Sequence, residues 1–326
     1  MFIFKKLFYI ELIDDYTHFK QRLIITILGF KLRFSIKIKN KRLYKKFINK
    51  IKPRLLNSDI KVEFAKSLAH VDVAICAIYK NEPDIIEWIE YHKLIGVDRF
   101  YLYDNDSDYD ERRLLQPYID SGTVIYHQVK GRCMQMPVYR DAAMRYKNDT
   151  KWLAFLDLDE YICPIDKNNI KEIIKNYEQY PAIVVNWLLF DSNGLVNRPN
   201  KFVIEAYTRC QKTKHIKTIC KPKKISMMPS PHYFIYKNHR LAVDENYNTV
   251  LPNYISQKYN GDKIRINHYH TKSLNDWQRK VIIGYADQVK DRPYNIKEVY
   301  FSDAVKDYTI QKYLPELKLI LKDRLL

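Results

Sequence analysis

Glycine is scarce in this sequence: only seven glycines occur among 326 residues, against 27 tyrosines. Neither the glycine-rich loop of P-loop nucleotide-binding proteins nor the GxGxxG turn of dinucleotide-binding folds can be assembled from them, so both classes are excluded. Collagen-like and Gly/Ser-linker sequences are excluded for the same reason. Hydrophobic residues nevertheless make up 46% of the chain and charged residues 29%, which is enough apolar material for a large folded core.

Cysteine is also sparse, and its residues form no CxxC pair. The five are Cys76, Cys133, Cys163, Cys210 and Cys220. An odd, scattered set predicts neither a disulfide scaffold nor a zinc knuckle, and it favours a reducing compartment. Long apolar runs are missing too. Charged residues interrupt the first 16 positions, so we expect neither a signal peptide nor a membrane span there.

Acidic residues are rare at the start of the chain. Residues 1–70 hold 17 Lys and Arg against five Asp and Glu, a net charge of +12 out of +18 for the whole sequence. A uniformly basic nucleic-acid-binding protein would not show this asymmetry, so no nucleic-acid partner is expected. The asymmetry favours attachment to an anionic membrane surface. We therefore expect a cytoplasmic protein, peripheral at the inner face of the cytoplasmic membrane.

Residues 22–39 predict a β-hairpin with its turn at Gly29, because apolar residues alternate with basic ones from Phe30 onward. Such a hairpin could dock on a membrane or a partner, or it could be an ordinary half-buried hairpin with a solvated basic face. Residues 40–70 are basic, contain Pro53, and predict a helix followed by a linker.

From residue 71, apolar runs alternate with amphipathic stretches, which is typical of βαβ units and of an α/β fold with a mostly parallel sheet flanked by helices. The expected strands are 71–79, 98–104, 123–129, 152–160 and 182–190. The expected helices are 83–96, about 110–120, about 137–148 and 167–180. Beyond about 275 the sequence predicts helices. We therefore divide the chain into a basic segment (1–70), an α/β domain (71–275) and a helical extension (276–326).

Acidic residues follow two of these strands, at the strand ends where open parallel sheets bind ligands. Asp104 ends the strand 98–104, and Asp157 and Asp159 end the strand 152–160. Two carboxylates at i and i+2 on an extended strand point the same way, so they could hold one Mg²⁺ or Mn²⁺ that keeps open positions for diphosphate oxygens. The alternative is an acidic turn that only caps the strand, since Asp is common in such turns.

Two further segments could contribute to the same site. His268 and His270 follow the predicted strand KIRIN at strand spacing, and a neutral imidazole is a legitimate ligand for Mn²⁺. A structural histidine pair is the alternative. The loop YDNDSDYD (103–110) could hydrogen-bond a base or ribose, or it could form a plain Asx turn and helix cap.

Several segments, taken in their order along the chain, together resemble the motifs of a known family. They are KNEPDIIEWIEYHKLIGVDRFYLYDNDSDYD (80–110), Gln135 with Tyr139, WLAFLDLDEYICP (152–164), NWLLFDSNG (186–194) and NHYHTKS (267–273). Together they resemble glycosyltransferase family 92 and related family 2-like bacterial glycosyltransferases of the GT-A fold, over roughly residues 71–285. The segment ITILGFKLRF resembles a short module that precedes the catalytic domain in bacterial lipopolysaccharide-type glycosyltransferases.

The resemblance implies inverting transfer of a sugar from a nucleotide sugar, most often a UDP-sugar, with Mn²⁺ or Mg²⁺, to a bacterial surface glycan or glycolipid. It implies a role for individual residues as well. The metal residues are Asp157, Asp159 and His268, and the nucleotide-binding residues are Lys80, Asn81, Glu82, Asp104 and Lys272. One departure is Asp191, where relatives tend to carry glycine after phenylalanine.

Sugar transfer needs a carboxylate that accepts the proton of the acceptor hydroxyl, and the sequence offers Asp191 or Glu160 for this role. Two other functions are consistent with the same residues. A nucleotidyltransferase would use the paired acids and a metal for attack at phosphorus. A non-catalytic protein that binds a membrane or another anionic surface would explain the basic start of the chain, but not the acids at two strand ends.

Overall fold

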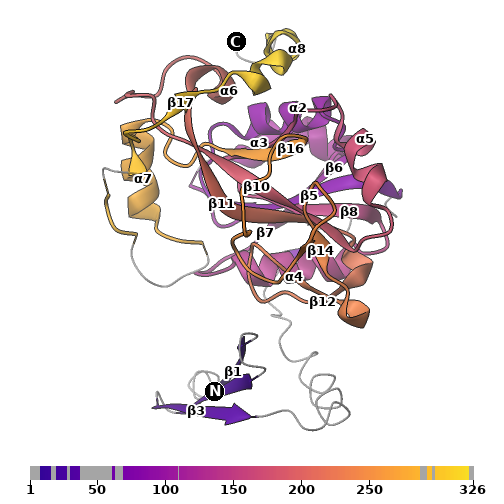
Figure 1. Cartoon of the computed structure of the whole chain (residues 1–326). Coiled ribbons are helices and arrows are strands. Elements are labelled where there is room, and N and C mark those ends of the chain that lie inside the picture. Colours follow the sequence, from indigo (N-terminus) through magenta and orange to yellow (C-terminus); the bar gives the residue numbers. More distant parts are fainter. Residues whose placement is uncertain are drawn as a thin grey trace. The chain divides into compact units, whose positions relative to one another are not determined.

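The computed structural model (Figure 1) describes residues 8–15, 20–27, 30–36, 61–62, 69–108, 110–286, 292–295 and 298–322. The chain separates into two compact units, residues 1–57 and 58–326. In the first unit, β1 (Phe8–Asp15), β2 (Lys20–Ile27) and β3 (Phe30–Ile36) form an antiparallel sheet in that order. Strands β2 and β3 confirm the predicted hairpin, whereas β1 was not predicted. The helix and linker expected at 40–70 lie almost entirely outside the described residues, and the division at 70 and 275 stays a prediction.

The second unit is built on a sheet in which the described residues form 12 strands. Four neighbouring strands run parallel in the order β8-β5-β6-β7, with the bounds β5 (Val71–Tyr79), β6 (Arg99–Asp104), β7 (Val124–Gln128) and β8 (Thr150–Phe155). Strands β5, β6 and β7 coincide with predicted strands to within one residue at each end, and β8 overlaps the first part of the predicted strand 152–160. The predicted α/β fold, with a mostly parallel central sheet flanked by helices, is confirmed.

A long strand that the sequence did not predict enters this sheet. Strand β11 (Arg209–Cys220) lies between β8 and β10 (Ala182–Phe190) and runs antiparallel to both. The predicted strand 182–190 therefore does not lie directly beside the strand that precedes the paired acids, because β11 occupies that place. The other strands of the sheet are β4 (Lys61–Val62), β9 (Glu160–Pro164), β14 (Ala242–Val243), β15 (Thr249–Val250), β16 (Ile264–His268) and β17 (Val305–Lys306).

Helices cover both faces of the sheet (Figure 1). They are α2 (Ile85–Leu94), α3 (Glu111–Asp120), α4 (Gln135–Arg145), α5 (Ile170–Ile174), α6 (Val203–Ala206), α7 (Leu274–Ile283) and α8 (Leu314–Leu321). One core cluster joins the sheet to α2, α3, α5 and α8, through residues such as Trp88 and Leu317. The other joins it to α4 and to the small β12 (Ile225–Met227) and β13 (Ile235–Tyr236) pair. The central strands are thus buried on both sides, which explains their continuous apolar sequences.

The predicted strand 152–160 is divided in two. Strand β8 ends at Phe155, and β9 begins at Glu160. Between them the backbone N–H of Glu160 donates to the carbonyl of Asp157 at 3.0 Å and closes a turn. Asp157 and Asp159 therefore lie in a turn, and the prediction of two acids on one extended strand is wrong in this detail. The turn matters because it allows the two carboxylates to face different partners.

The C-terminal region is less helical than predicted. Strand β17 pairs with β11 before the short 3-10 helix η7 (Thr309–Tyr313) and α8 begin. Three other 3-10 helices are η3 (Lys175–Tyr177), η4 (Pro222–Lys224) and η5 (Lys237–His239). Within the described part of the chain, none of the helices combines the length and the apolar character that crossing a bilayer requires.

Candidate active site

A cavity of about 690 Å³ lies at the carboxyl ends of β5, β8 and β16. Tyr79 ends β5, Asp157 follows β8 and His268 ends β16, and all three line it. Lys280 of α7 and Tyr285 contribute another wall. This is the edge at which open parallel sheets bind ligands, and the volume falls within the range of about 300 to 1,000 Å³ typical of small-molecule sites.

Asp157 is held by three donors of the chain itself. Its Oδ1 accepts hydrogen bonds from Gln135 Nε2 at 2.7 Å and from the Tyr139 hydroxyl at 3.3 Å. Its Oδ2 accepts from Lys217 Nζ at 3.0 Å. Burial raises the pKa of Asp157, but the Lys217 ammonium outweighs this effect and the pKa lies below its ordinary value. The carboxylate is therefore ionised, and both of its oxygens already have a donor.

The lysine that contacts Asp157 is buried. Lys217 lies on β11 with 1% of its side chain exposed, and its Nζ is 3.2 Å from Glu160 Oε2. Glu160 is fully buried and also accepts the backbone N–H of Asp157 at 2.8 Å. Burial raises the pKa of Glu160 well above its ordinary value. Because Glu160 does not line the cavity, the geometry does not favour its predicted role as proton acceptor.

Asp159, His268 and His270 form a group that could hold a metal ion. One ligand atom from each lies within 4.8 Å of the others. Within the part of the chain that the structure describes, the Nδ1 atoms of both histidines are buried without a hydrogen-bond partner, and Asp159 Oδ1 lies 3.4 Å from His268 Nε2. A buried carboxylate oxygen beside unpartnered imidazole nitrogens suits Mn²⁺. This group keeps two of the three predicted metal residues, adds His270, and does not include Asp157.

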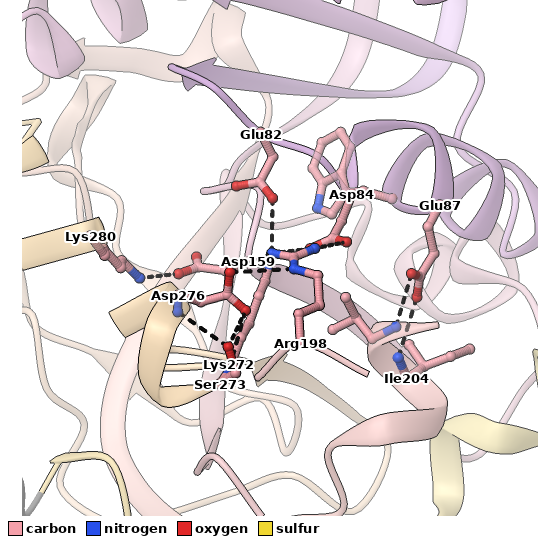
Figure 2. Close-up of polar contacts among 12 residues, drawn as sticks. Glu82, Asp84, Glu87, Asp159, Arg198, Ile204, Lys272, Ser273, Asp276 and Lys280 are labelled. Carbon is pink, nitrogen blue, oxygen red and sulfur yellow. Dashed lines mark hydrogen bonds and ion pairs between the residues drawn. The ribbon is translucent and has the colours of Figure 1, made fainter. Parts of the chain in front are cut away.

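The protonation states in this group suit metal binding, which requires neutral imidazoles. Burial, together with the Lys280 ammonium, lowers the pKa of His270 to about 3. Burial also lowers the pKa of His268. Lys280 contacts Asp159 Oδ2 (Figure 2). It also donates to the carbonyl of His270 at 2.8 Å. Burial raises the pKa of Asp159, but Lys280 and His268 together outweigh it and hold the pKa well below its ordinary value.

A second network of charges lies beside this group (Figure 2). Lys272 Nζ is 2.8 Å from Glu82 Oε1 and also contacts Asp84. Arg198 contacts Asp84 as well, and its Nη2 is 2.9 Å from Asp276 Oδ1. Burial lowers the pKa of Lys272, but the two carboxylates outweigh it and the pKa lies above its ordinary value. Lys272 is thus cationic, and its charge is already balanced by two acids.

The residues directly after β5 line the cavity as predicted. Lys80, Asn81 and Glu82 are all part of its wall. Asn81 adopts a φ of 54° and exchanges two hydrogen bonds with Asp108, one from its own Nδ2 and one from the Asp108 backbone N–H, each 2.7 Å long. Asn tolerates this left-handed backbone better than most residues do. The two bonds tie the end of β5 to the loop after β6.

Asp104 ends β6 as predicted, but it is not among the residues that line the cavity. Its Oδ1 accepts the backbone N–H of Ser107 at 2.9 Å, and its Oδ2 accepts the Tyr126 hydroxyl at 2.7 Å. Two following residues, Asn105 and Asp106, line the cavity instead. Asp104 therefore shapes the loop after β6 that contributes to the cavity wall.

Asp191 is fully buried at the turn after β10. Its Oδ1 accepts the backbone N–H of Asn193 at 2.8 Å, and its Oδ2 accepts the backbone N–H of Phe301 at 2.9 Å. Arg209 Nε lies 3.2 Å from the same Oδ2. These contacts join three separate segments and leave Asp191 outside the cavity wall. The geometry does not favour its predicted role as proton acceptor.

The structure brings together most of the predicted site residues. Those that line the cavity are Lys80, Asn81, Glu82, Asp157, Asp159, His268 and Lys272. Those that do not are Asp104, Glu160 and Asp191. The sequence reasoning missed Lys217, which contacts Asp157 and Glu160, and Lys280, which contacts Asp159. It also missed Arg198, which contacts Asp84 and Asp276. In the sequence Lys217 looks like its neighbours Lys212 and Lys214, which are exposed, and no local signal separates them.

Most of this chain is similar in sequence to known proteins. The sequence profile described as Glycosyltransferase family 92 matches residues 70–317. A family 92 protein of Oryza sativa subsp. japonica is 25% identical over 272 residues, which is 74% of this chain and 44% of that protein. One of Arabidopsis thaliana is 27% identical over 257 residues, 72% of this chain and 44% of that protein. The chain thus spans less than half the length of these relatives.

Two further proteins are similar to shorter parts of this chain. Galactan β-1,4-galactosyltransferase GALS3 of Arabidopsis thaliana is 28% identical over 116 residues, 32% of this chain and 23% of that protein. The solved structure of S. aureus TarS 1–349 aligns with 47% of each chain at 14% identity and a TM-score of 0.32. The family profile covers all of the cavity residues described above. The chain therefore belongs to glycosyltransferase family 92.

Proposed function

We propose that this chain is a metal-dependent, inverting glycosyltransferase that moves a sugar from a nucleotide sugar, with UDP-sugars as the first candidates, to an acceptor hydroxyl. Membership of family 92 supports the reaction class. The observation that carries the proposal is the group of Asp159, His268 and His270, which borders a cavity at the carboxyl ends of the strands. Unpartnered ligand atoms at such a place are what a metal-assisted transfer to or from a diphosphate requires.

Asp159, His268 and His270 would hold Mn²⁺ or Mg²⁺, and the two imidazoles favour Mn²⁺. When bound, the ion would offset the negative charge that develops on the leaving diphosphate. The chain's own cations would attract the same group. Lys80 and Arg132 line the cavity and are placed to meet a diphosphate, whereas Lys272 contributes less because two carboxylates balance its charge.

The proton of the acceptor hydroxyl needs a carboxylate that substrate can reach. Glu160 and Asp191 are fully buried, but Glu82 lines the cavity with 20% of its side chain exposed. Burial raises the pKa of Glu82, which suits a general base, and the Lys272 ammonium opposes this only in part. We assign proton acceptance to Glu82.

The acceptor we propose is a bacterial surface glycan or glycolipid, reached from the inner face of the cytoplasmic membrane. The basic segment 1–70 supports attachment to anionic lipid. Galactosyl transfer to a galactan is a second candidate, supported by the partial similarity to GALS3. Both fit the same chemistry at the donor, so UDP-galactose belongs in the first set of donors tested.

A panel of nucleotide sugars tests the proposal. We expect Mn²⁺-dependent release of nucleoside diphosphate from one donor and loss of this release in EDTA. Asp159→Asn is expected to abolish the Mn²⁺-dependent release of nucleoside diphosphate. Glu82→Gln is expected to lower kcat by roughly 100-fold or more and to leave UDP binding unchanged. Release of pyrophosphate from a nucleoside triphosphate, with no diphosphate release from any nucleotide sugar, would instead identify a nucleotidyltransferase.

A further inference from the structure

Lys217 has an unusual position for a lysine. It lies on β11 with 1% of its side chain exposed, yet it borders the cavity. Removing an ammonium from water is costly unless paired carboxylates compensate, and Lys217 has two of them. Asp157 Oδ2 is 3.0 Å away and Glu160 Oε2 is 3.2 Å away. The other lysines of the strand, Lys212 and Lys214, are exposed.

The contacts of Lys217 determine what Asp157 can do. Gln135 and Tyr139 engage one oxygen of Asp157, and Lys217 engages the other. By contrast, the neighbour that the structure gives Asp159 Oδ1 is His268 Nε2 at 3.4 Å, which belongs to the same metal-binding group, and no other described residue donates to this oxygen. The two acids of the Asp-x-Asp sequence are therefore not equivalent: one is held by the protein, and the other has an oxygen available for an ion.

We propose that Lys217 is a positioning residue that holds Asp157 apart from the metal-binding group of Asp159, His268 and His270, so that only one carboxylate binds the ion. Glu160 supports it from the opposite side, since it contacts both Lys217 and the backbone N–H of Asp157. The inference rests on the proposed function, because it concerns the same site.

Charge gives the physical reason for such an arrangement. With Lys217 removed, the Asp157 carboxylate would add uncompensated negative charge beside Asp159, whereas the buried Glu160 would take up a proton. An ion would then bind more tightly and gain a second carboxylate, while a diphosphate would be repelled. With Lys217 in place, the ion keeps open positions and the anionic donor can approach. Lys217 thus lowers the affinity of the site for the ion and raises its affinity for the anionic donor.

Mn²⁺ binding to the full chain without any nucleotide tests this inference. We expect Asp159→Asn to weaken binding by more than the roughly 10- to 100-fold that loss of an outer hydrogen-bond partner costs. Asp157→Asn should stay within about threefold of the unmodified chain. Lys217→Met should bind Mn²⁺ more tightly, on the order of tenfold, because one nearby positive charge is lost. The matched control is Lys214→Met, an exposed lysine of the same strand, which should leave Mn²⁺ affinity unchanged.

The outcomes separate the two proposals. Equal loss of Mn²⁺ binding in Asp157→Asn and Asp159→Asn overturns the inference. Weaker Mn²⁺ binding by a folded Lys217→Met variant overturns it too. Neither result contradicts the proposed function. Absence of Mn²⁺ binding by the unmodified chain overturns the metal-dependent function together with the inference. Circular dichroism and thermal melting establish that each variant is folded. If Lys217→Met does not fold, the comparison of Asp157→Asn with Asp159→Asn decides alone.

Discussion

At the scale of single residues, the site is organised by pairs of opposite charge. Asp157 contacts Lys217, and Asp159 contacts Lys280. Removing one member of a buried pair is far more costly than the pair is worth, because it leaves an uncompensated charge away from water. Substitutions here therefore change stability as well as chemistry, and a test of function must separate the two effects.

Asp191 provides such a separation. We expect Asp191→Asn to lower the free energy of unfolding by about 2 to 4 kcal/mol, because the amide leaves Arg209 without its carboxylate and weakens the contact to the Phe301 N–H. The turnover of the folded protein should change little. Urea denaturation, together with diphosphate release per folded molecule, measures both quantities.

Asp303→Asn is the control, since Asp303 is an exposed acid of the neighbouring segment and its amide should leave stability unchanged. If Asp191→Asn were as stable as the unmodified chain but inactive, Asp191 would act as a general base after all. The structural account of this residue would then be wrong.

At the scale of elements, helix α2 fixes the strand that carries Glu160. Trp88 Nε1 donates to the carbonyl of Glu160 at 2.8 Å, and the Tyr91 hydroxyl donates to the carbonyl of Ile162 at 2.7 Å. His92 Nδ1 lies 2.8 Å from the carbonyl of Trp88, and its Nε2 accepts the N–H of Ile162 at 3.2 Å. This arrangement requires a neutral imidazole, because a protonated Nε2 would point its hydrogen at another donor.

His92 makes the stability depend on pH. Burial lowers the pKa of His92 to about 3, below the ordinary value of about 6.5. The folded state then resists a proton that the unfolded state accepts, so stability is retained above pH 6.5 and lost as the pH falls. Between pH 7 and pH 5 we expect His92→Gln to lose about 2 kcal/mol less of its free energy of unfolding than the unmodified chain does.

Urea denaturation at pH 7, 6 and 5 measures this difference. The control is His70→Gln, which replaces an exposed histidine and should leave the slope with pH as it is in the unmodified chain. Parallel stability curves for His92→Gln and the unmodified chain would show that His92 is protonated in the folded protein.

At the scale of the whole molecule, charge and chemistry are assigned to different parts. The compact unit 1–57 belongs to the basic segment, which carries +12 over residues 1–70, and the cavity lies entirely within the unit 58–326. The two roles should therefore be separable. Attraction of basic residues to anionic lipid is worth about 1 kcal/mol per residue near the surface and is weakened by salt.

We expect deletion of residues 1–57 to abolish binding to vesicles that contain anionic lipid, while diphosphate release from the soluble donor persists. Sedimentation with vesicles of phosphatidylcholine, with and without about one quarter phosphatidylglycerol, measures the binding at low and high salt. Vesicle binding that survives the deletion, or that is insensitive to salt, would assign attachment to another part of the chain.

The sequence by itself determined the central parallel strands and the residues at their ends. Strand β5 matches its predicted range, because a run of buried apolar residues needs only local information to be recognised. The sequence also located Asp157, Asp159 and His268, since the carboxyl ends of parallel strands meet at one edge of the sheet. It did not reveal β11, because residues 209–220 mix charged and apolar positions without a regular period.

Only the tertiary structure decided which charges meet. Asp157 and Lys217 are 60 residues apart, Asp159 and Lys280 are 121 apart, and Glu82 and Lys272 are 190 apart. The local sequence around a lysine does not show whether it pairs with an acid so far away in the chain. A lysine on a strand has the same local sequence whether its ammonium group lies in water or between two carboxylates. The sequence therefore determines the positions of the acids along the chain. The fold determines which acids are paired with a cation and which can bind an ion.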